Sequence, residues 1–150
     1  MAISGILDAL DSTTPEGRKL IAEIEKFNSM EAVAGFPNGP DDVVAIAAYN
    51  EFGTSTIPPR PFIQQTMSKH EGEISETFAS AVAQVMSGAT AEDALNQIGK
   101  TFKEMIQAEI SSGDFVPNAP ETVAKKGSST PLIDTGRMRD SVDYMVRTKG

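Results

Sequence analysis

Residues 57–62 read IPPRPF, and a long helical pattern begins directly after them. Proline fixes its own φ and biases the preceding residue away from the helical region, so Pro58, Pro59 and Pro61 predict a stiff, extended corner. Arg60, held in this corner, can donate several directed hydrogen bonds to a carbonyl group or a carboxylate. We therefore expect the corner to set the angle at which the following helix leaves.

Downstream of the corner, apolar residues recur at helical spacing in two long stretches. The first covers residues 63–85, and Gly72 is the point where a kink is expected. The second covers residues 94–110 and follows Thr90 and Asp93, which have the spacing of a helix N-cap and an acidic third helical position. Joined by SGAT, the two stretches predict a helical hairpin at the centre of the fold.

Two helical patterns and a strand precede the corner. Pro15 suits the first turn of a helix that reaches about Phe27, and residues 31–36, EAVAGF, are predicted as a strand closed by the turn-forming PNGP. Before that helix, an earlier set of apolar residues recurs at helical spacing: Ile3, Ile6, Leu7 and Leu10.

One further helix lies between the strand and the corner. Asp41 or Asp42 is expected to cap it, and Gly53 is expected to end it. Four of its residues share one face: Ala45, Ala48, Tyr49 and Phe52.

The last third of the chain has a different composition. Residues 114–133 are rich in Pro, Ser, Thr and Lys, which predicts an extended loop or arm with at most one short helix. A short helical turn is expected at 135–141, and the alternation in VDYMVRT, residues 142–148, predicts a final strand. Residues 1–150 are therefore expected to form a single α+β domain, with a small, mostly antiparallel sheet packed against the helical hairpin and additional short helices.

Composition narrows the function classes. The net charge of −8 and the pI near 4.6 argue against a protein that grips phosphate backbones over its whole surface. The charge is uneven: residues 117–150 hold six basic and four acidic residues, a net of +2, which leaves −10 for residues 1–116. Copies of the chain could therefore meet basic region to acidic region.

No cofactor and no metal site are expected. The chain has no cysteine and one histidine, His70, so thiolate sites and multi-histidine sites are excluded. The first residues have no basic region of the kind that opens a signal peptide, and no stretch is long and apolar enough to span a bilayer.

Three motifs resemble chemistry. Asp134-Thr135-Gly136 resembles an aspartic protease loop, but Arg137 follows directly and opposes the proton sharing that such a carboxylate pair needs, so Asp134 is better explained as a helix cap. A catalytic histidine needs a nucleophile and an orienting group, which the sequence alone does not identify, so His70 is interpreted as a partly buried packing residue. We therefore expect no enzyme and assign no catalytic residue. Residues 58–61 match the PxxP pattern of SH3 ligands, which keeps a peptide-displaying adaptor as the alternative function.

Two clusters of residues resemble a phage protein family. Glu51-Phe52-Gly53-Thr54 is followed by Pro59-Arg60-Pro61-Phe62 opening a long helix. Near the end of the chain stand Pro120, Thr122, Lys126, Pro131-Leu132, Thr135-Gly136, Met138 and Ser141. Over about residues 45–146 this pattern resembles the tail-completion and minor tail component proteins of long-tailed bacteriophages, including the virion morphogenesis family typified by phage Mu. Where a tryptophan anchor is expected before the second cluster, this chain has Phe115-Val116-Pro117.

The resemblance implies a structural virion protein at the head–tail junction, made in the host cytoplasm and located in the virion. It implies a homo-oligomeric ring, expected to be a hexamer, with DNA only as cargo in its channel and with no membrane contact. The neighbours would be the connector or stopper, the tail terminator and the tail tube. The expected interface and motif residues are Glu51, Phe52, Gly53, Pro59, Arg60, Pro61, Phe62, Leu132, Asp134, Thr135, Gly136, Arg137 and Arg139. Phe62 is expected in the core or an interface, and loss of Arg60 is expected to impair assembly more than folding.

Overall fold

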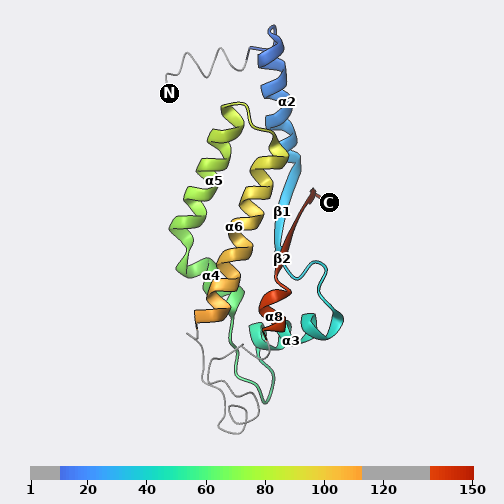
Figure 1. The fold of residues 1–150 in the computed structure, drawn as a ribbon, viewed down its shortest axis with the longest axis vertical. Helices are drawn as coiled ribbons and strands as arrows, with labels where there is room; N and C mark the ends of the chain where they lie inside the picture. The colour runs from blue at the N-terminus through green and yellow to red at the C-terminus, as the bar shows by residue number, and fades with distance from the viewer. Residues whose placement is uncertain (1–10, 113–135) are drawn as a thin grey trace. The chain divides into compact units, whose positions relative to one another are not determined.

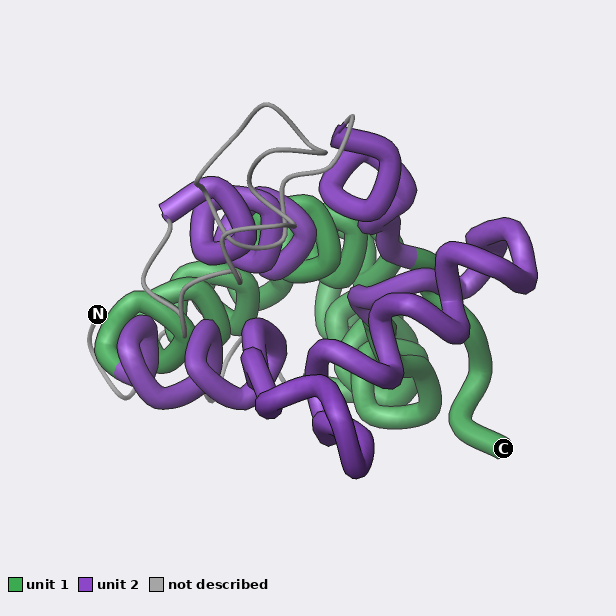
Figure 2. The backbone as a smooth tube through the Cα atoms, turned by 90° about the horizontal axis from the view of Figure 1, so that it is seen from below, with its two compact units in different colours: residues 1–33, 72–101, 145–150 green, residues 34–71, 102–144 purple. Residues whose placement is uncertain are grey.

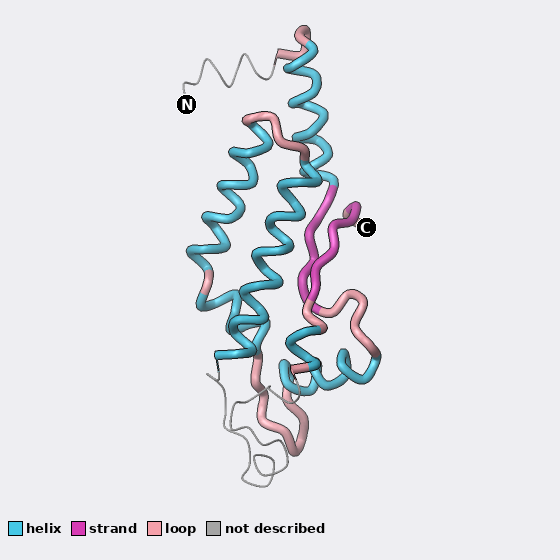
Figure 3. The backbone as a smooth tube through the Cα atoms, in the orientation of Figure 1, coloured by secondary structure: helices cyan, strands magenta, loops and turns pink. Residues whose placement is uncertain are grey.

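The computed structural model describes residues 11–112 and 136–150 (Figures 1 and 3). In chain order its elements are α2 (Pro15–Ser29), β1 (Met30–Gly35), α3 (Asp41–Phe52), α4 (Phe62–Lys69), α5 (Glu71–Met86), α6 (Ala91–Ser112), α8 (Arg137–Asp140) and β2 (Asp143–Thr148). The two strands form an antiparallel sheet, and the long helix α5 packs against it. The expected α+β class is therefore confirmed. Within these two stretches of chain, no helix has both the length and the apolar character that a membrane crossing needs.

The helical hairpin forms as predicted. Helix α5 ends at Met86, and α6 begins at Ala91 after the SGAT turn. The backbone N–H of Asp93 donates to Thr90 Oγ1 at 3.1 Å, so the predicted cap at the start of α6 is present. The predicted long helix before the turn is interrupted at His70, which separates α4 from α5, two residues before the kink expected at Gly72.

The strand pairing is marked by contacts at one end of the sheet. The backbone N–H of Lys149 donates to the Ser29 carbonyl at 2.9 Å, and Arg147 Nε donates to Glu31 Oε1 at 2.9 Å. Both pairs fit the same antiparallel register, in which Glu31 lies opposite Arg147. Opposite charges facing each other across two strands favour this register.

By contact density the chain separates into two compact units (Figure 2). Unit 1 consists of residues 1–33, 72–101 and 145–150, and unit 2 consists of residues 34–71 and 102–144. Each unit is built from segments that are distant in the sequence. The expectation of one domain over residues 1–150 stays a prediction.

In unit 1, helix α2 is attached to the start of α6. Glu23 Oε2 accepts a hydrogen bond from the backbone N–H of Ala91 at 2.6 Å, which satisfies one of the free donors at that helix end. Lys26 Nζ lies 2.9 Å from Glu92 Oε1. The partner carboxylate raises the pKa of Lys26 above its ordinary value. Helix α2 is thus oriented by polar contacts on one side of its surface.

Unit 2 contains a continuous apolar core. Its buried members come from α3, α4, α6, α8 and the residue before β2: Val43, Ala47, Phe62, Ile106, Ile110, Met138 and Val142. Phe62 is fully buried, and its ring packs edge-on against that of Phe36, with the ring centroids 6.0 Å apart. Edge-to-face packing of this kind stabilises aromatic pairs beyond their burial alone.

One predicted helix cap is wrong. The N-cap of α3 is Pro40, and Asp41 and Asp42 lie inside the first turn, where acidic side chains complement the helix dipole. The N-cap of α8 is Gly136, in the left-handed conformation. The cap role predicted for Asp134 lies outside the described residues. The helical pattern at residues 3–10 and the arm at 114–133 fall outside the described residues.

Candidate functional site

The first family-like cluster has two parts, residues 51–54 and residues 59–62, and they meet at the end of α3. The backbone N–H of Gly53 closes the helix on the Tyr49 carbonyl at 2.8 Å, and the Gly53 φ is +74°. A Cβ atom at Gly53 would lie 3.0 Å from the Pro59 ring. Only glycine combines this φ with so close an approach, so Gly53 and Pro59 are matched parts of one corner.

Glu51 caps the next helix. Its carboxylate accepts hydrogen bonds from the backbone N–H groups of Ile63, at 2.9 Å, and Gln64, at 3.1 Å. These groups belong to the first turn of α4, whose own N-cap, Pro61, offers no side-chain hydrogen bond. The negative charge also complements the positive end of the helix dipole. Glu51 therefore joins the end of α3 to the start of α4.

The proline segment is fixed in place between these helices. The backbone N–H of Arg60 donates to the Asn50 carbonyl at 2.5 Å, and that of Phe62 donates to the Arg60 carbonyl at 2.8 Å. Pro61, with φ −77° and ψ 73°, has the dihedral angles of an inverse γ-turn. IPPRPF is thus a folded corner that starts α4.

The side chain of Arg60 points away from solvent, since the residue is only 8% exposed. Burial lowers the pKa of its guanidinium, although an arginine stays charged in proteins. An SH3 ligand presents its arginine to the partner domain. The burial of Arg60 therefore disfavours the displayed-peptide interpretation of residues 58–61.

The opposite side of α3 is apolar and exposed. We call it the outer α3 face. Tyr49, 51% exposed, and Phe52, 81% exposed, lie on it, and Val44 and Ile46, 41% and 47% exposed, lie at its two edges. The buried side of the same helix is formed by Val43 and Ala47. Ile57, in the following loop, is a further exposed apolar side chain. Apolar patches exposed on a folded protein often mark contact sites.

The sequence of α3 itself contains a signal for this face. Residues 43–49, VVAIAAY, contain no charged side chain and place apolar groups all around the helix. A helix that is apolar on every side is normally covered on every side. Because the core of unit 2 covers only the side formed by Val43 and Ala47, the pattern indicates a second covering surface for α3.

The second motif cluster also meets α3. Arg137, the first residue of α8, pairs with both carboxylate oxygens of Asp42, and its Nη2 lies 3.1 Å from Asp42 Oδ1. Hydrogen bonding to Arg137 lowers the pKa of the Asp42 carboxyl. The Arg139 carbonyl accepts a hydrogen bond from Gln107 Nε2 at 3.2 Å, and Arg139 Nε donates to Asp140 Oδ1 at 3.3 Å. Leu132, Asp134 and Thr135 lie outside the described residues.

Helix α6 holds a buried carboxylate that no pattern in the sequence predicts. Glu109 is 4% exposed, and its oxygens accept from Gln65 Nε2 at 2.6 Å and lie 2.8 Å from Lys69 Nζ. His70 Nε2 lies 3.6 Å from the same carboxylate, and its side chain is partly buried, as expected. Burial acts to raise the pKa of Glu109, but Lys69, Gln65 and His70 outweigh it, so this pKa is lowered. The cluster ties the end of α4 to α6.

Residues 11–112 and 136–150 contain no group of three or more His, Asp or Glu side chains placed to hold a metal ion. Comparison of the chain with protein-family models, with curated proteins and with solved structures found no match.

Proposed function

We propose that this protein is a structural subunit of the head–tail junction of a long-tailed bacteriophage and assembles into a ring of identical subunits around the DNA channel. The observation that carries the proposal is the outer α3 face, where four apolar side chains lie exposed beside the corner built by the family-like motif. A neighbouring copy would cover this face.

Burial of Phe52 would stabilise a self-contact that includes this side chain. This ring is 81% exposed in the isolated chain, and burial of a Phe side chain contributes about 1.5–3 kcal/mol. Aromatic residues near the centre of an interface often dominate its affinity. If the outer α3 face of one copy contacts a different surface of the next copy, the contact is head-to-tail. Such contacts close into a ring when the rotation between neighbouring copies divides a full turn into equal parts.

Pairing between the basic C-terminal region of one copy and the acidic region of the next has a smaller part in this proposal than the sequence suggested. The basic residues Arg137 and Arg147 already pair with Asp42 and Glu31 within the same chain. Pairing of basic and acidic regions between copies would have to compete with these contacts. The net charge of −8 instead suits a ring through which DNA slides, because carboxylates repel phosphates.

The proposal also revises the role of Arg60. An interface residue was expected, but the side chain is buried beside the fully buried Phe62. Substitution of either residue is therefore expected to impair folding first. The assembly role moves to Phe52 and its neighbours on α3.

Oligomeric state tests the proposal. The purified chain is examined by light scattering over a concentration series, with negative-stain images of the same fractions. Rings with a central hole, and a mass that is a fixed multiple of the 16.0 kDa subunit, support it. A monomer that binds SH3 domains through residues 58–61 would instead support the adaptor alternative.

A further inference from the structure

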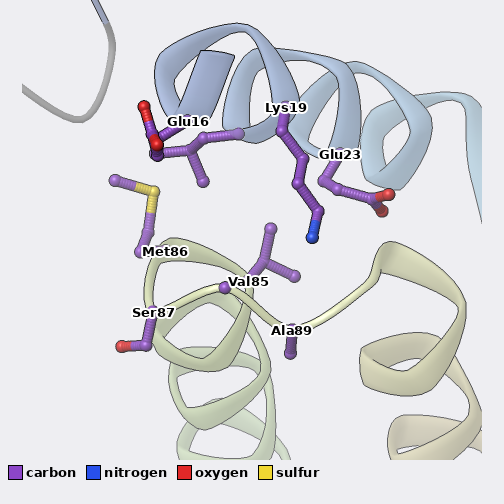
Figure 4. A pocket seen from close by; sticks show the side chains of 9 residues that line it. Glu16, Lys19, Glu23, Val85, Met86, Ser87 and Ala89 are labelled. Carbon is purple, nitrogen blue, oxygen red and sulfur yellow. The ribbon is translucent and has the colours of Figure 1, made fainter. Parts of the chain in front are cut away.

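Two exposed features of the molecule have no part in the proposed function. One is a groove between α2 and the end of α5, with a cavity of about 310 Å³ and a charged rim of Glu16, Lys19 and Glu23 (Figure 4). Because the hydrophobic effect is non-directional, the apolar lining of this groove does not identify one partner. The other feature is the open edge of strand β2, where directed hydrogen bonds and charges do.

Strand β2 has β1 on one side and, within the described residues, no strand on the other (Figure 3). The bond from the Lys149 N–H to the Ser29 carbonyl fixes the register, in which every second residue of β2 bonds to β1. The backbone groups of the residues in between point away from β1. These outward residues are Tyr144, Val146 and Thr148.

Two outward N–H groups have no acceptor in the described part of the chain. They belong to Val146 and Thr148. The outward N–H of Tyr144 donates to Asp143 Oδ1 at 2.8 Å, a bond within the strand itself. A strand edge with unpaired donors is a template for a further strand.

We propose that β2 pairs with β2 of a second copy, antiparallel and with Val146 opposite Val146 on a two-fold axis. In this register Tyr144 lies opposite Thr148 of the second copy, so all the outward residues enter the new ladder. Moving the axis by one residue in either direction leaves one of them without a strand partner. Hydrogen bonding therefore favours the register centred on Val146.

The side-chain charges favour the same register. Asp143 lies opposite Lys149 of the second copy, and the two-fold axis repeats this pair at the other end of the contact. In the single chain the Asp143 carboxylate is 50% exposed and lies 3.6 Å from Lys103 Nζ, so it can turn toward a second copy. An axis at Arg147 would instead place two arginines opposite each other, which is unfavourable.

This contact is small and separate from the outer α3 face. Two six-residue strands bury much less than the roughly 800 Å² per partner of a stable complex, so single chains pair weakly and stay monomeric in dilute solution. A two-fold contact joins copies in pairs, whereas the proposed ring needs head-to-tail contacts. The edge of β2 is therefore a second self-contact, and it does not depend on ring assembly.

Disulfide trapping detects such a weak pair, and the full-length chain has no cysteine of its own. Val146→Cys places a thiol opposite its own copy, where the Cα atoms of a hydrogen-bonded pair lie about 5.5 Å apart, within the range of a disulfide. The matched control, Met145→Cys, points to the other face of the sheet and lies off the two-fold axis. Val146→Cys should form disulfide-linked dimers roughly tenfold faster than the control.

A charge exchange tests the register. In the Val146→Cys background, Asp143→Lys and Lys149→Asp each place like charges opposite each other when two identical chains pair. A mixture of the two variants restores opposite charges at both ends of the contact. Mixed dimers, identified by mass, should therefore form roughly tenfold faster than dimers of either variant alone.

Thr148→Pro tests the backbone bonds. It removes an outward donor and no bond to β1, and proline is tolerated at an edge position of this kind. In the Val146→Cys background it should slow trapping roughly tenfold while the circular dichroism stays that of the parent chain. The proposal is overturned by equal trapping rates for Val146→Cys and Met145→Cys, by mixed dimers that form no faster than unmixed ones, or by trapping that the proline leaves unchanged.

Discussion

The two sides of helix α3 differ in burial and in hydrogen bonding. On the inner side, Glu51 caps α4, and the corner that follows α3 leads through the buried Arg60 to the fully buried Phe62 of α4. On the outer side, Phe52 and Tyr49 project into solvent with no core to enter. Glu51 and Phe52 are neighbours in the same short motif, yet one maintains the subunit and the other is available to a partner.

The comparison separates folding from assembly within one motif. A fully buried ring contributes to the stability of the isolated chain, whereas an exposed ring contributes only when something covers it. Substitutions on the inner side should therefore change the free energy of unfolding. Substitutions on the outer side should change the oligomeric state.

The largest effect is expected for Phe62→Ala. Removing a fully buried ring leaves a cavity and should lower the free energy of unfolding by about 3–5 kcal/mol. The matched control, Phe52→Ala, should change it by less than about 0.5 kcal/mol when measured on the monomer. Urea unfolding followed by circular dichroism makes the comparison, and similar losses in the two variants would erase the distinction between the two sides.

Glu109 tests the polar part of the inner side. Glu109→Gln should lower the free energy of unfolding by about 1–3 kcal/mol at neutral pH, because Lys69 loses its buried partner. The pKa of Glu109 is lowered from its ordinary 4.5, so its stabilising contribution is complete above that pH and is lost as the pH falls below it. The variant should therefore lose less stability than the parent chain between about pH 5 and pH 3 in urea titrations. An identical acid dependence would show that Glu109 does not contribute.

Glu51→Ala should lower the free energy of unfolding by about 0.5–2 kcal/mol, the usual effect of removing a helix cap. Glu51→Gln keeps an acceptor oxygen for the first turn of α4 and should recover part of that loss. Chemical unfolding of the two variants measures the difference. An alanine variant as stable as the parent chain would mean that solvent satisfies the α4 donors equally well.

The smallest effect is expected for Asp42→Asn. Both side chains of the Asp42–Arg137 pair are more than half exposed, at 58% and 55%, and such pairs contribute little to stability. We expect no measurable change in the urea midpoint. A clear loss would place the contact between α3 and α8 among the determinants of the fold.

Local rules predicted much of the fold. Pro15 marks the start of α2, Gly53 ends α3, and the SGAT turn joins α5 to α6, because each depends on residues within a few positions. The break between α4 and α5 was predicted at Gly72, because glycine is a weak helix former. The structure places it two residues earlier, at His70. At His70 a distant residue, Glu109, contacts the end of α4.

The candidate site was predicted less completely, since its contacts join distant positions. Glu51 reaches donors 12 and 13 residues away, and Arg137 pairs with a residue 95 positions earlier. Rules based on residue spacing relate positions a few residues apart and cannot predict such pairs. The burial of Arg60 also depends on the whole core around the corner, whereas the uncharged run at residues 43–49 of α3 is visible in the sequence itself.

The most direct test of the account is the solution mass of Phe52→Ser compared with that of the parent chain at equal concentrations, measured by light scattering. If the outer α3 face joins copies of the chain, the parent chain forms a ring and the variant is a folded monomer with an unchanged urea midpoint. A variant that forms the same ring as the parent chain would contradict the account.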